Sequence, residues 1–282
     1  MKKSTQEFQN RQILKSDTFE IFYYRDEKPK SVSVHHHDFY EIYLFLGGQV
    51  SYRVEGKTYC LEVGDLLLIN PEEMHQPYVT SGVAYERIVL WINRNFLDKI
   101  CLDGVNLKAC FENKLDNRIH PESSTATRLI ELMKKLTQEY YSDNFGGAAY
   151  STGLFYQIMV EVNRLAQRGD KFRKQEKPDL ITKVVAYINQ NYAEPITLDN
   201  LAKEFFVSKY YLSHEFTRYY GTSVYKYIIL KRLLIAKEKI AEGIPIGEVC
   251  KLCGFGDYTT FFRAFKAEYG INPRQFANSL IE

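Results

Sequence analysis

The sequence predicts a two-domain α+β protein, with an N-terminal β-barrel and a flanking αα-hairpin followed by an all-α domain. Three observations predict this class. Short apolar and aromatic runs broken by turn residues extend to about residue 115, helical periodicity follows from about residue 123, and a charge-dense segment precedes a purely helical stretch that begins near residue 180. A length of 282 residues suits about two domains.

The predicted barrel covers about residues 15–115. Val50, Tyr52 and Val54 alternate with polar residues, as expected of a strand with one buried face. The pattern breaks at Gly56 and again at Gly64, where turns are expected. Several such runs in succession are typical of an antiparallel barrel or sandwich.

Two amphipathic helices are predicted over about residues 123–167. Leu129, Met133 and Leu136 recur at helical spacing, and Ser123 or Ser124 is the expected N-cap. The helices must bury their apolar stripes against the barrel, against a second subunit, or against both. Domain boundaries are expected at 1–167 for the first domain, 168–179 for a polar linker ending in proline, and 180–282 for the second domain.

The last region contains an internal near-repeat. ITLDNLAKEFFVSKYYLSHEFTRYYG matches IPIGEVCKLCGFGDYTTFFRAFKAEYG, and each copy indicates a short helix, a tight turn and a longer helix. Helix-turn-helix units are therefore predicted at 197–220 and 246–269, with N-caps at Thr197, Ser208 and Asp257. A long helix over 224–241 joins them. The alternative is a helical bundle with a duplicated hairpin.

The second helix of each unit separates into two faces. The expected apolar stripes are Leu212, Phe216 and Tyr219 in the first unit and Phe261, Ala264 and Phe265 in the second. The expected DNA-contacting residues are Tyr210, Ser213, His214, Thr217, Arg218, Tyr258, Thr259, Phe262, Arg263 and Lys266. Arg263 is the candidate for contact with guanine, Phe262 for a thymine methyl group, and Arg218 and Lys266 for phosphates.

These motifs resemble the DNA-binding domain of the AraC/XylS family of bacterial transcription regulators. The matching segments are LDNLAKEFFVSKYYLSHEFTRYYG and GFGDYTTFFRAFKAEYGINPRQF. The resemblance implies a two-lobed helical domain that places one helix of each lobe in the major groove of double-stranded DNA. It also implies activation of transcription through contact with RNA polymerase. Phe206 departs from the family pattern, which has a small residue in this turn.

A histidine-rich cluster marks the N-terminal region. His35 and His37 face the same side of an extended segment, Glu41 follows, and His75 comes after a later turn. The cluster resembles the cupin fold and the sensor domain of many AraC-type regulators, although Pro29 stands where the first cupin motif has glycine.

Three readings of the cluster stay open. It forms the wall of a small-molecule effector pocket, a divalent metal site, or a hydrogen-bonded structural group. The predicted pocket residues are His35, His37, Glu41, Tyr43, Tyr52 and His75, and the metal ligands, if a metal is present, are His35, His37, Glu41 and His75. No cofactor is otherwise expected. A sugar suits these groups, with Tyr40, Tyr43 and Tyr52 as stacking partners.

Composition predicts where in the cell the protein is found, but it says little about what the protein binds. A net charge of +2 is only a weak indication of nucleic-acid binding. The sequence has no apolar run of ~18 residues and no signal-peptide pattern, which predicts a cytoplasmic protein without membrane contact. Five scattered cysteines do not suggest a disulfide framework, and Cys250 and Cys253 are expected in the core rather than in a redox or metal site.

The sequence therefore favours a non-enzymatic, effector-responsive DNA-binding regulator, expected to activate transcription as a homodimer. One alternative is a metal-dependent cupin enzyme fused to a DNA-binding domain, favoured only by the His/Glu cluster. Another is a constitutive DNA-binding protein whose barrel serves assembly alone. The sequence shows no nucleophile–base motif, phosphate loop or dinucleotide fingerprint that would favour an enzyme.

Overall fold

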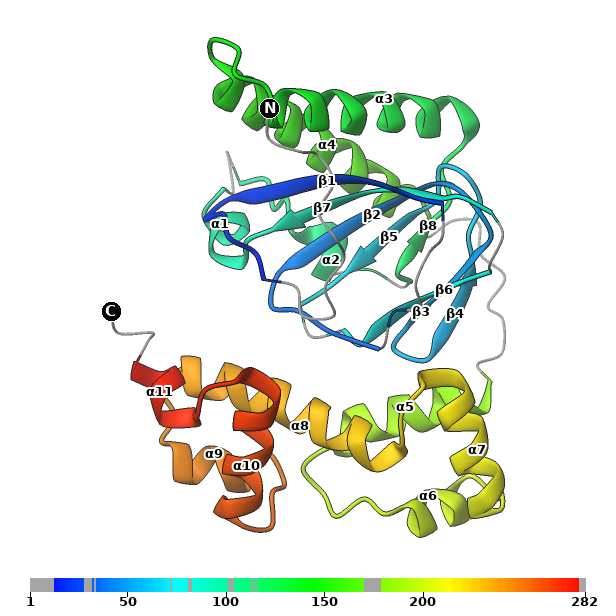
Figure 1. The fold of residues 1–282 in the computed structure, drawn as a ribbon, viewed down its shortest axis with the longest axis vertical. Coiled ribbons are helices and arrows are strands. Elements are labelled where there is room, and N and C mark those ends of the chain that lie inside the picture. Colours follow the sequence, from blue (N-terminus) through cyan, green and yellow to red (C-terminus); the bar gives the residue numbers. More distant parts are fainter. Residues whose placement is uncertain are drawn as a thin grey trace. The chain divides into compact units, whose positions relative to one another are not determined.

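The structure is a computed structural model, and it divides into two compact units. The first contains the strands and helices α1–α4, and the second contains helices α5–α11 (Figure 1). The described residues are 13–27, 32, 34–71, 73–80, 83–100, 104–112, 114, 116–169 and 179–278. The predicted two-domain α+β class is confirmed. In the described part of the chain, no helix is long and apolar enough to span a membrane.

The strands of the first unit form two sheets. A five-stranded sheet has the order β1-β7-β2-β5-β8, and a three-stranded sheet has the order β4-β3-β6. The strands are β1 (Phe19–Asp26), β2 (Tyr40–Gly47), β3 (Val50–Val54), β4 (Lys57–Cys60), β5 (Leu66–Ile69), β6 (His75–Val79), β7 (Tyr85–Ile92) and β8 (Arg118–Ile119). Buried residues from both sheets belong to one apolar cluster, so the sheets enclose a common interior.

The five-stranded sheet is buried on both faces. Because side chains alternate along a strand, β7 directs Val89 and Trp91 into the interior between the sheets, whereas Ile88, Leu90 and Ile92 join a second core on the other face. This double burial explains why β7 lacks the polar alternation of a half-exposed strand.

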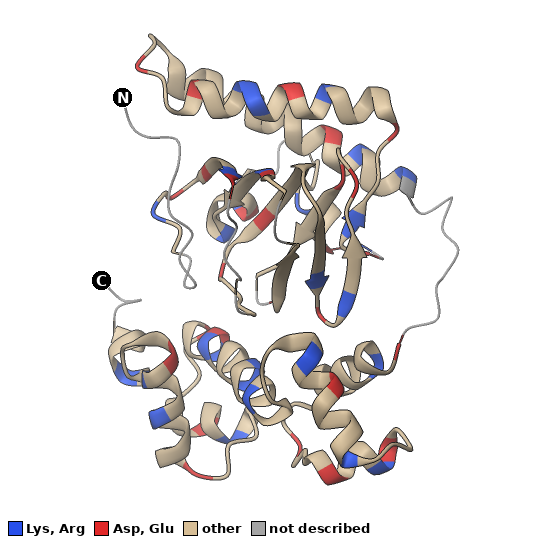
Figure 2. Cartoon of the chain, turned by 45° about the vertical axis from the view of Figure 1, so that its right-hand side comes forward, with Lys and Arg blue, Asp and Glu red and all other residues tan. Residues whose placement is uncertain are grey.

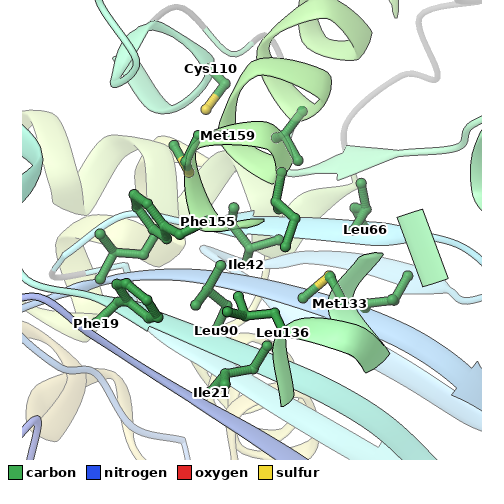
Figure 3. Close-up of a cluster of buried hydrophobic side chains, with 14 of the residues drawn as sticks. Phe19, Ile21, Ile42, Leu66, Leu90, Cys110, Met133, Leu136, Phe155 and Met159 are labelled. Carbon is green, nitrogen blue, oxygen red and sulfur yellow. The ribbon is translucent and has the colours of Figure 1, made fainter. Parts of the chain in front are cut away.

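Two long helices, α3 (Ser123–Tyr140) and α4 (Gly147–Gly169), cover that second face. Figure 3 shows Met133 and Leu136 of α3 and Phe155 of α4 packed against strand residues that include Ile21 and Leu90. The short helices α1 (Arg94–Lys99) and α2 (Ala109–Glu112) add Leu97, Cys110 and Phe111 to the same core. The predicted apolar stripes therefore pad the sheet.

The start of α3 differs from the prediction. The N-cap is Glu122, which makes no side-chain capping hydrogen bond. Ser123 and Ser124 already lie within the first helical turn, where their side chains do not occupy the cap position, so the serine cap was wrong.

The second unit is entirely helical. Its helices are α5 (Leu180–Asn191), α6 (Leu198–Glu204), α7 (Lys209–Tyr220), α8 (Val224–Ala241), α9 (Ile246–Leu252), α10 (Tyr258–Tyr269) and α11 (Pro273–Asn278). The long helix α8 runs without a break, as predicted. Its first half packs Tyr227 against Phe216 of α7, and its second half places Leu233 and Ile240 in a core with α9 and α10. Helix α8 thus contributes to the cores of both lobes of this unit, the first formed with α5–α7 and the second with α9–α11.

Arg232 of α8 also binds the connection between α5 and α6. Its guanidinium donates hydrogen bonds to the carbonyl oxygens of Tyr192 and Glu194, each at 2.7 Å. Cys250 and Cys253 are buried free thiols in the core of the second lobe, which agrees with the expected packing role.

Candidate functional site

Two helix-turn-helix units lie at α6–α7 and α9–α10. The predicted caps are all present: the side chains of Thr197, Ser208 and Asp257 accept hydrogen bonds from the backbone N–H groups three residues later, at 3.1, 3.1 and 2.8 Å. Gly221 and Gly270 end α7 and α10 in the left-handed conformation that stops a helix. The two longer helices therefore have matching starts and ends.

Each longer helix buries one face. In α7 the buried residues are Leu212, Phe216 and Tyr220, so the predicted stripe with Tyr219 was wrong at its last member. Successive i+4 steps from Leu212 reach Tyr220, while Tyr219 stays half-buried. In α10 Phe261 and Phe265 are buried, and the predicted Ala264 is half-buried at the edge of the same core.

The opposite face of α7 points to solvent. Tyr210 is 80% exposed, His214, Thr217 and Arg218 are exposed, and Ser213 is half-buried. Tyr210 stacks on His214, and Arg218 forms an ion pair with Glu215. This acidic neighbour lowers the net positive charge that α7 presents.

The solvent face of α10 carries Tyr258, Thr259, Arg263 and Lys266, with Phe262 half-buried beside them. Among the described residues, neither Arg263 nor Lys266 has an ion-pair partner, which distinguishes α10 from α7. Basic and acidic residues are interspersed over the helical unit as a whole (Figure 2). Helix α10 thus presents two cationic side chains to solvent, Arg263 and Lys266.

The turns of the two units differ. Phe206 adopts a left-handed φ of 54° and is 95% exposed, whereas Gly254 occupies the left-handed turn position of the second unit with φ of 75°. A side chain with a Cβ is strained in this region, and glycine is not. The unusual residue noted in the sequence thus sits at a strained, solvent-facing point of the first turn.

Three polar side chains lie close together inside the first unit: two come from strands, and one comes from the loop before β2. His37 precedes β2, Glu41 lies in β2, and His75 begins β6, and they are 4%, 3% and 1% exposed. One ligand atom of each lies within 4.8 Å of the others. The fourth predicted member, His35, forms a backbone bridge with His75, and their ring centroids are 4.3 Å apart.

Hydrogen bonds fix the orientation of each of these side chains. Nδ1 of His37 donates to the Phe39 carbonyl at 2.9 Å, and Nδ1 of His75 donates to the Glu73 carbonyl at 2.7 Å. Nε2 of His37 lies 3.1 Å from Oε2 of Glu41. Burial, together with neighbouring His35 and His37, holds the pKa of His75 well below its ordinary value, so this ring is neutral.

Aromatic side chains adjoin the cluster. Tyr43 and Tyr52 lie with ring centroids 4.9 Å apart, and the Tyr52 ring is 6.2 Å from that of His75. Burial raises the pKa of both phenols well above the ordinary value, so each keeps its proton. The expected third aromatic was wrong: Tyr40 packs on Phe111 on the helix-covered face, because odd and even residues of β2 point in opposite directions.

Sequence reasoning missed the contribution of β7 to this interior. The indole N–H of Trp91 donates to Oε2 of Glu41 at 3.0 Å, and the hydroxyl of Tyr85 lies 2.6 Å from that of Tyr43. The Arg87 guanidinium lies 4.1 Å from the Tyr85 ring centroid and pairs with Asp26. Tyr85, Arg87 and Trp91 are separated by two and four residues along β7, and these even separations could have revealed their shared face.

A sheet unit with polar groups in its interior, followed by two helix-turn-helix units, defines a ligand-binding transcription regulator. The comparisons agree. Residues 19–159 match the model of the AraC-like ligand binding domain, and residues 201–279 match a helix-turn-helix domain. The chain belongs to the AraC family of DNA-binding transcription regulators.

Relatives span nearly the whole chain. A probable transcriptional regulator, LumQ, from Photobacterium leiognathi is 27% identical, over 88% of this chain and 92% of the relative. The transcriptional activator RhaS of Escherichia fergusonii is 21% identical, over 86% of each chain.

Solved structures are similar at lower levels. ToxT of Vibrio cholerae is 15% identical with a TM-score of 0.41, over 94% of this chain and 98% of that one. The DNA-binding domain of AdpA, solved with a target DNA, is 22% identical with a TM-score of 0.35, over 36% of this chain and 92% of that one.

Proposed function

We propose that the protein activates transcription in response to a small polyhydroxylated molecule, such as a sugar, held between the two sheets. The supporting observation is the presence of buried polar groups within an otherwise apolar interior. The protonated phenols of Tyr43 and Tyr52 can donate hydrogen bonds to a ligand, and the Glu41 carboxylate can accept hydrogen bonds from it. Hydroxyl groups of a ligand match both kinds of partner. The similarity to RhaS, which is described as a transcriptional activator, supports the proposal that this protein activates transcription.

On the DNA side, we assign the solvent faces of α7 and α10 to the major groove. Arg263 is the proposed reader of guanine, since its guanidinium is exposed and lacks an ion-pair partner among the described residues. Lys266 and Arg218 are the proposed phosphate contacts. The remaining proposed contacts are Tyr210, Ser213, His214, Thr217, Tyr258, Thr259 and Phe262.

Helix α8 joins the two lobes that carry α7 and α10. Helix α8 has 18 residues and is therefore about 27 Å long. Successive major grooves on one side of DNA are ~34 Å apart, so a single stiff helix between the lobes supports simultaneous entry into adjacent grooves.

For the domain assignment we keep 1–167 as the effector-binding and dimerisation domain, 168–179 as the linker and 180–282 as the DNA-binding domain. Residues 170–178 of the linker lie outside the described residues. We further propose a homodimer formed through the outer surfaces of α3 and α4, which would raise apparent DNA affinity by effective concentration, and contact with RNA polymerase.

The test has two stages. First, selection from random DNA with the full-length protein should yield one preferred binding sequence. Second, a member of a panel of sugars should change the affinity of the protein for that sequence or the output of a reporter gene under its control. Tyr52→Phe should weaken the response to the active sugar, and Tyr40→Phe, on the opposite face of the sheet, should not. A protein that binds its site equally with every compound would instead be a constitutive regulator.

A further inference from the structure

Arg87 places a cationic group in the interior between the two sheets. Across the five-stranded sheet it lies opposite Tyr24 of β1 and Phe45 of β2, which both belong to the apolar cluster of that interior. The residue is 6% exposed. A guanidinium stays protonated at physiological pH, so a permanent positive charge is buried here. Moving a charge out of water is costly unless acceptors replace the lost water.

The partners of Arg87 occupy only part of its guanidinium. Nη1 pairs with a carboxylate oxygen of Asp26 and donates a hydrogen bond to the Tyr85 carbonyl at 3.4 Å. The Asp26 side chain is 44% exposed, so this carboxylate is itself shared with solvent. Within the described part of the chain, the edge formed by Nε and Nη2 has no hydrogen-bond acceptor.

Two tyrosine rings hold the guanidinium in place. Its carbon Cζ lies 4.1 Å from the ring centroid of Tyr85 and 4.7 Å from that of Tyr24. Because a planar cation stacked on aromatic rings is already ordered, it loses little freedom when it binds a ligand. Two parallel N–H donors on one edge of a guanidinium match the two oxygens of a carboxylate.

Polar groups continue from Arg87 along the same face of the sheet. The hydroxyl of Tyr85 lies 2.6 Å from that of Tyr43. Glu41, which carries the opposite charge, is paired across the sheet with Trp91, four residues from Arg87 and about 13 Å along the strand. A ligand with one anionic end and several hydroxyl groups would therefore be held in one orientation, with its anion at Arg87 and its hydroxyls toward Glu41.

We propose that the effector is a hydroxylated carboxylate, such as a sugar acid, and that Nε and Nη2 of Arg87 bind its carboxylate. This assignment rests on the proposed function and narrows its ligand from neutral sugars to their acids. A neutral sugar brings no charge to the buried guanidinium, whereas a carboxylate brings two acceptors and a negative charge. A single guanidinium already shared with Asp26 suits the one charge of a carboxylate better than the near-double charge of a phosphate.

Matched pairs of compounds test the role of the carboxylate. Galacturonate and galactose, and likewise glucuronate and glucose, differ only by a carboxylate in place of a hydroxymethyl group. The full-length protein is titrated with each compound at constant ionic strength. Trp91 is the single tryptophan and is hydrogen-bonded to Glu41, so its fluorescence reports a ligand in this interior. The rise in Tm gives a second measure of binding.

At least one acid should bind saturably, with an affinity roughly tenfold or more above that of its neutral counterpart. Arg87→Gln should abolish this preference, and Arg87→Lys, which keeps the charge without the planar edge, should retain part of it. Arg53→Gln is the matched control and should leave the preference unchanged. Arg53 also packs on a tyrosine, 3.9 Å from the Tyr78 ring centroid, but it alternates with the inward-facing residues of β3. Circular dichroism checks that each variant is folded.

Neutral sugars that bind as tightly as their acids overturn the assignment and leave the proposed sugar response standing. A preference for acids that persists unchanged in folded Arg87→Gln overturns it as well. If none of the four compounds binds, the sugar and the sugar acid both fail. Acids that bind without changing DNA affinity or reporter output instead support the carboxylate site and contradict the proposed function. The wild-type comparison decides the matter even if Arg87→Gln fails to fold.

Discussion

Gly254 and Ala193 approach so closely that position 254 has no room for a side chain. A Cβ atom at Gly254 would lie 2.4 Å from the carbonyl oxygen of Ala193 and 2.9 Å from its Cα. The connection between α5 and α6 in the first lobe thus rests directly on the turn of the second helix-turn-helix unit. Together with the hydrogen bonds of Arg232 to Tyr192 and Glu194, this contact fixes one lobe against the other.

Gly254→Ala should destabilise the helical unit by about 1–3 kcal/mol, because it adds both a backbone clash and left-handed strain. Denaturant unfolding followed by circular dichroism measures the change. Gly247→Ala is the matched control: its Cβ meets nothing within 4 Å, and alanine favours the helix α9. Equal effects of the two substitutions would show that the close approach is unimportant.

Arg232→Ala should weaken binding to a DNA site that spans both lobes more than binding to half of that site. The substitution removes two charge-assisted hydrogen bonds, each worth about 1.5–3 kcal/mol, from the contact between the lobes. Titrations with full and half sites provide the comparison. A uniform loss on both would mean that Arg232 stabilises the fold without setting the spacing.

Phe206→Gly should raise the free energy of unfolding by about 1 kcal/mol, since glycine tolerates the left-handed φ of 54°. Phe206→Ala keeps a Cβ, and therefore the strain, and should bring no comparable gain. Thermal and chemical unfolding of both variants would be measured. A loss of stability in the glycine variant would reveal a contact of the exposed ring that outweighs the strain.

Arg263→Ala should reduce affinity for the selected DNA by about 1–3 kcal/mol while leaving non-specific binding nearly unchanged. A guanidinium that reads a base edge acts only at the correct sequence. Lys266→Ala should instead weaken both kinds of binding and reduce the salt dependence, as expected of a phosphate contact. Fluorescence anisotropy over a series of salt concentrations separates the two outcomes, and identical profiles would contradict the assigned roles.

The cysteines should differ sharply in reactivity. Burial raises the pKa of Cys110 to about 12 and that of Cys253 to about 11, so both stay protonated and shielded at neutral pH. Cys60 is exposed. In a Cys101→Ser background, a thiol reagent should modify one cysteine rapidly and the rest only after denaturation. Rapid modification of a second thiol would indicate that the core around that cysteine opens.

Much of the fold follows from local patterns. Helix α8 has the predicted bounds, and Thr197, Ser208 and Asp257 cap helices as expected, because capping and helical periodicity depend on neighbours within a few residues. The predicted serine N-cap of α3 was wrong because Ser123 and Ser124 are adjacent, and the sequence pattern does not show which residue is the first in the helix. Tyr40 was misplaced because strand phase was not followed from Glu41.

The sequence by itself determined the fold class, the duplicated helix-turn-helix units and the polar residue types of the sheet domain, since composition, periodicity and repetition are local properties. Only the tertiary structure decided that His37, Glu41 and His75 converge, that Trp91 binds Glu41, and that Ala193 occupies the space beside Gly254. Those contacts join residues on separate strands, helices and loops, and their distances depend on how the elements pack.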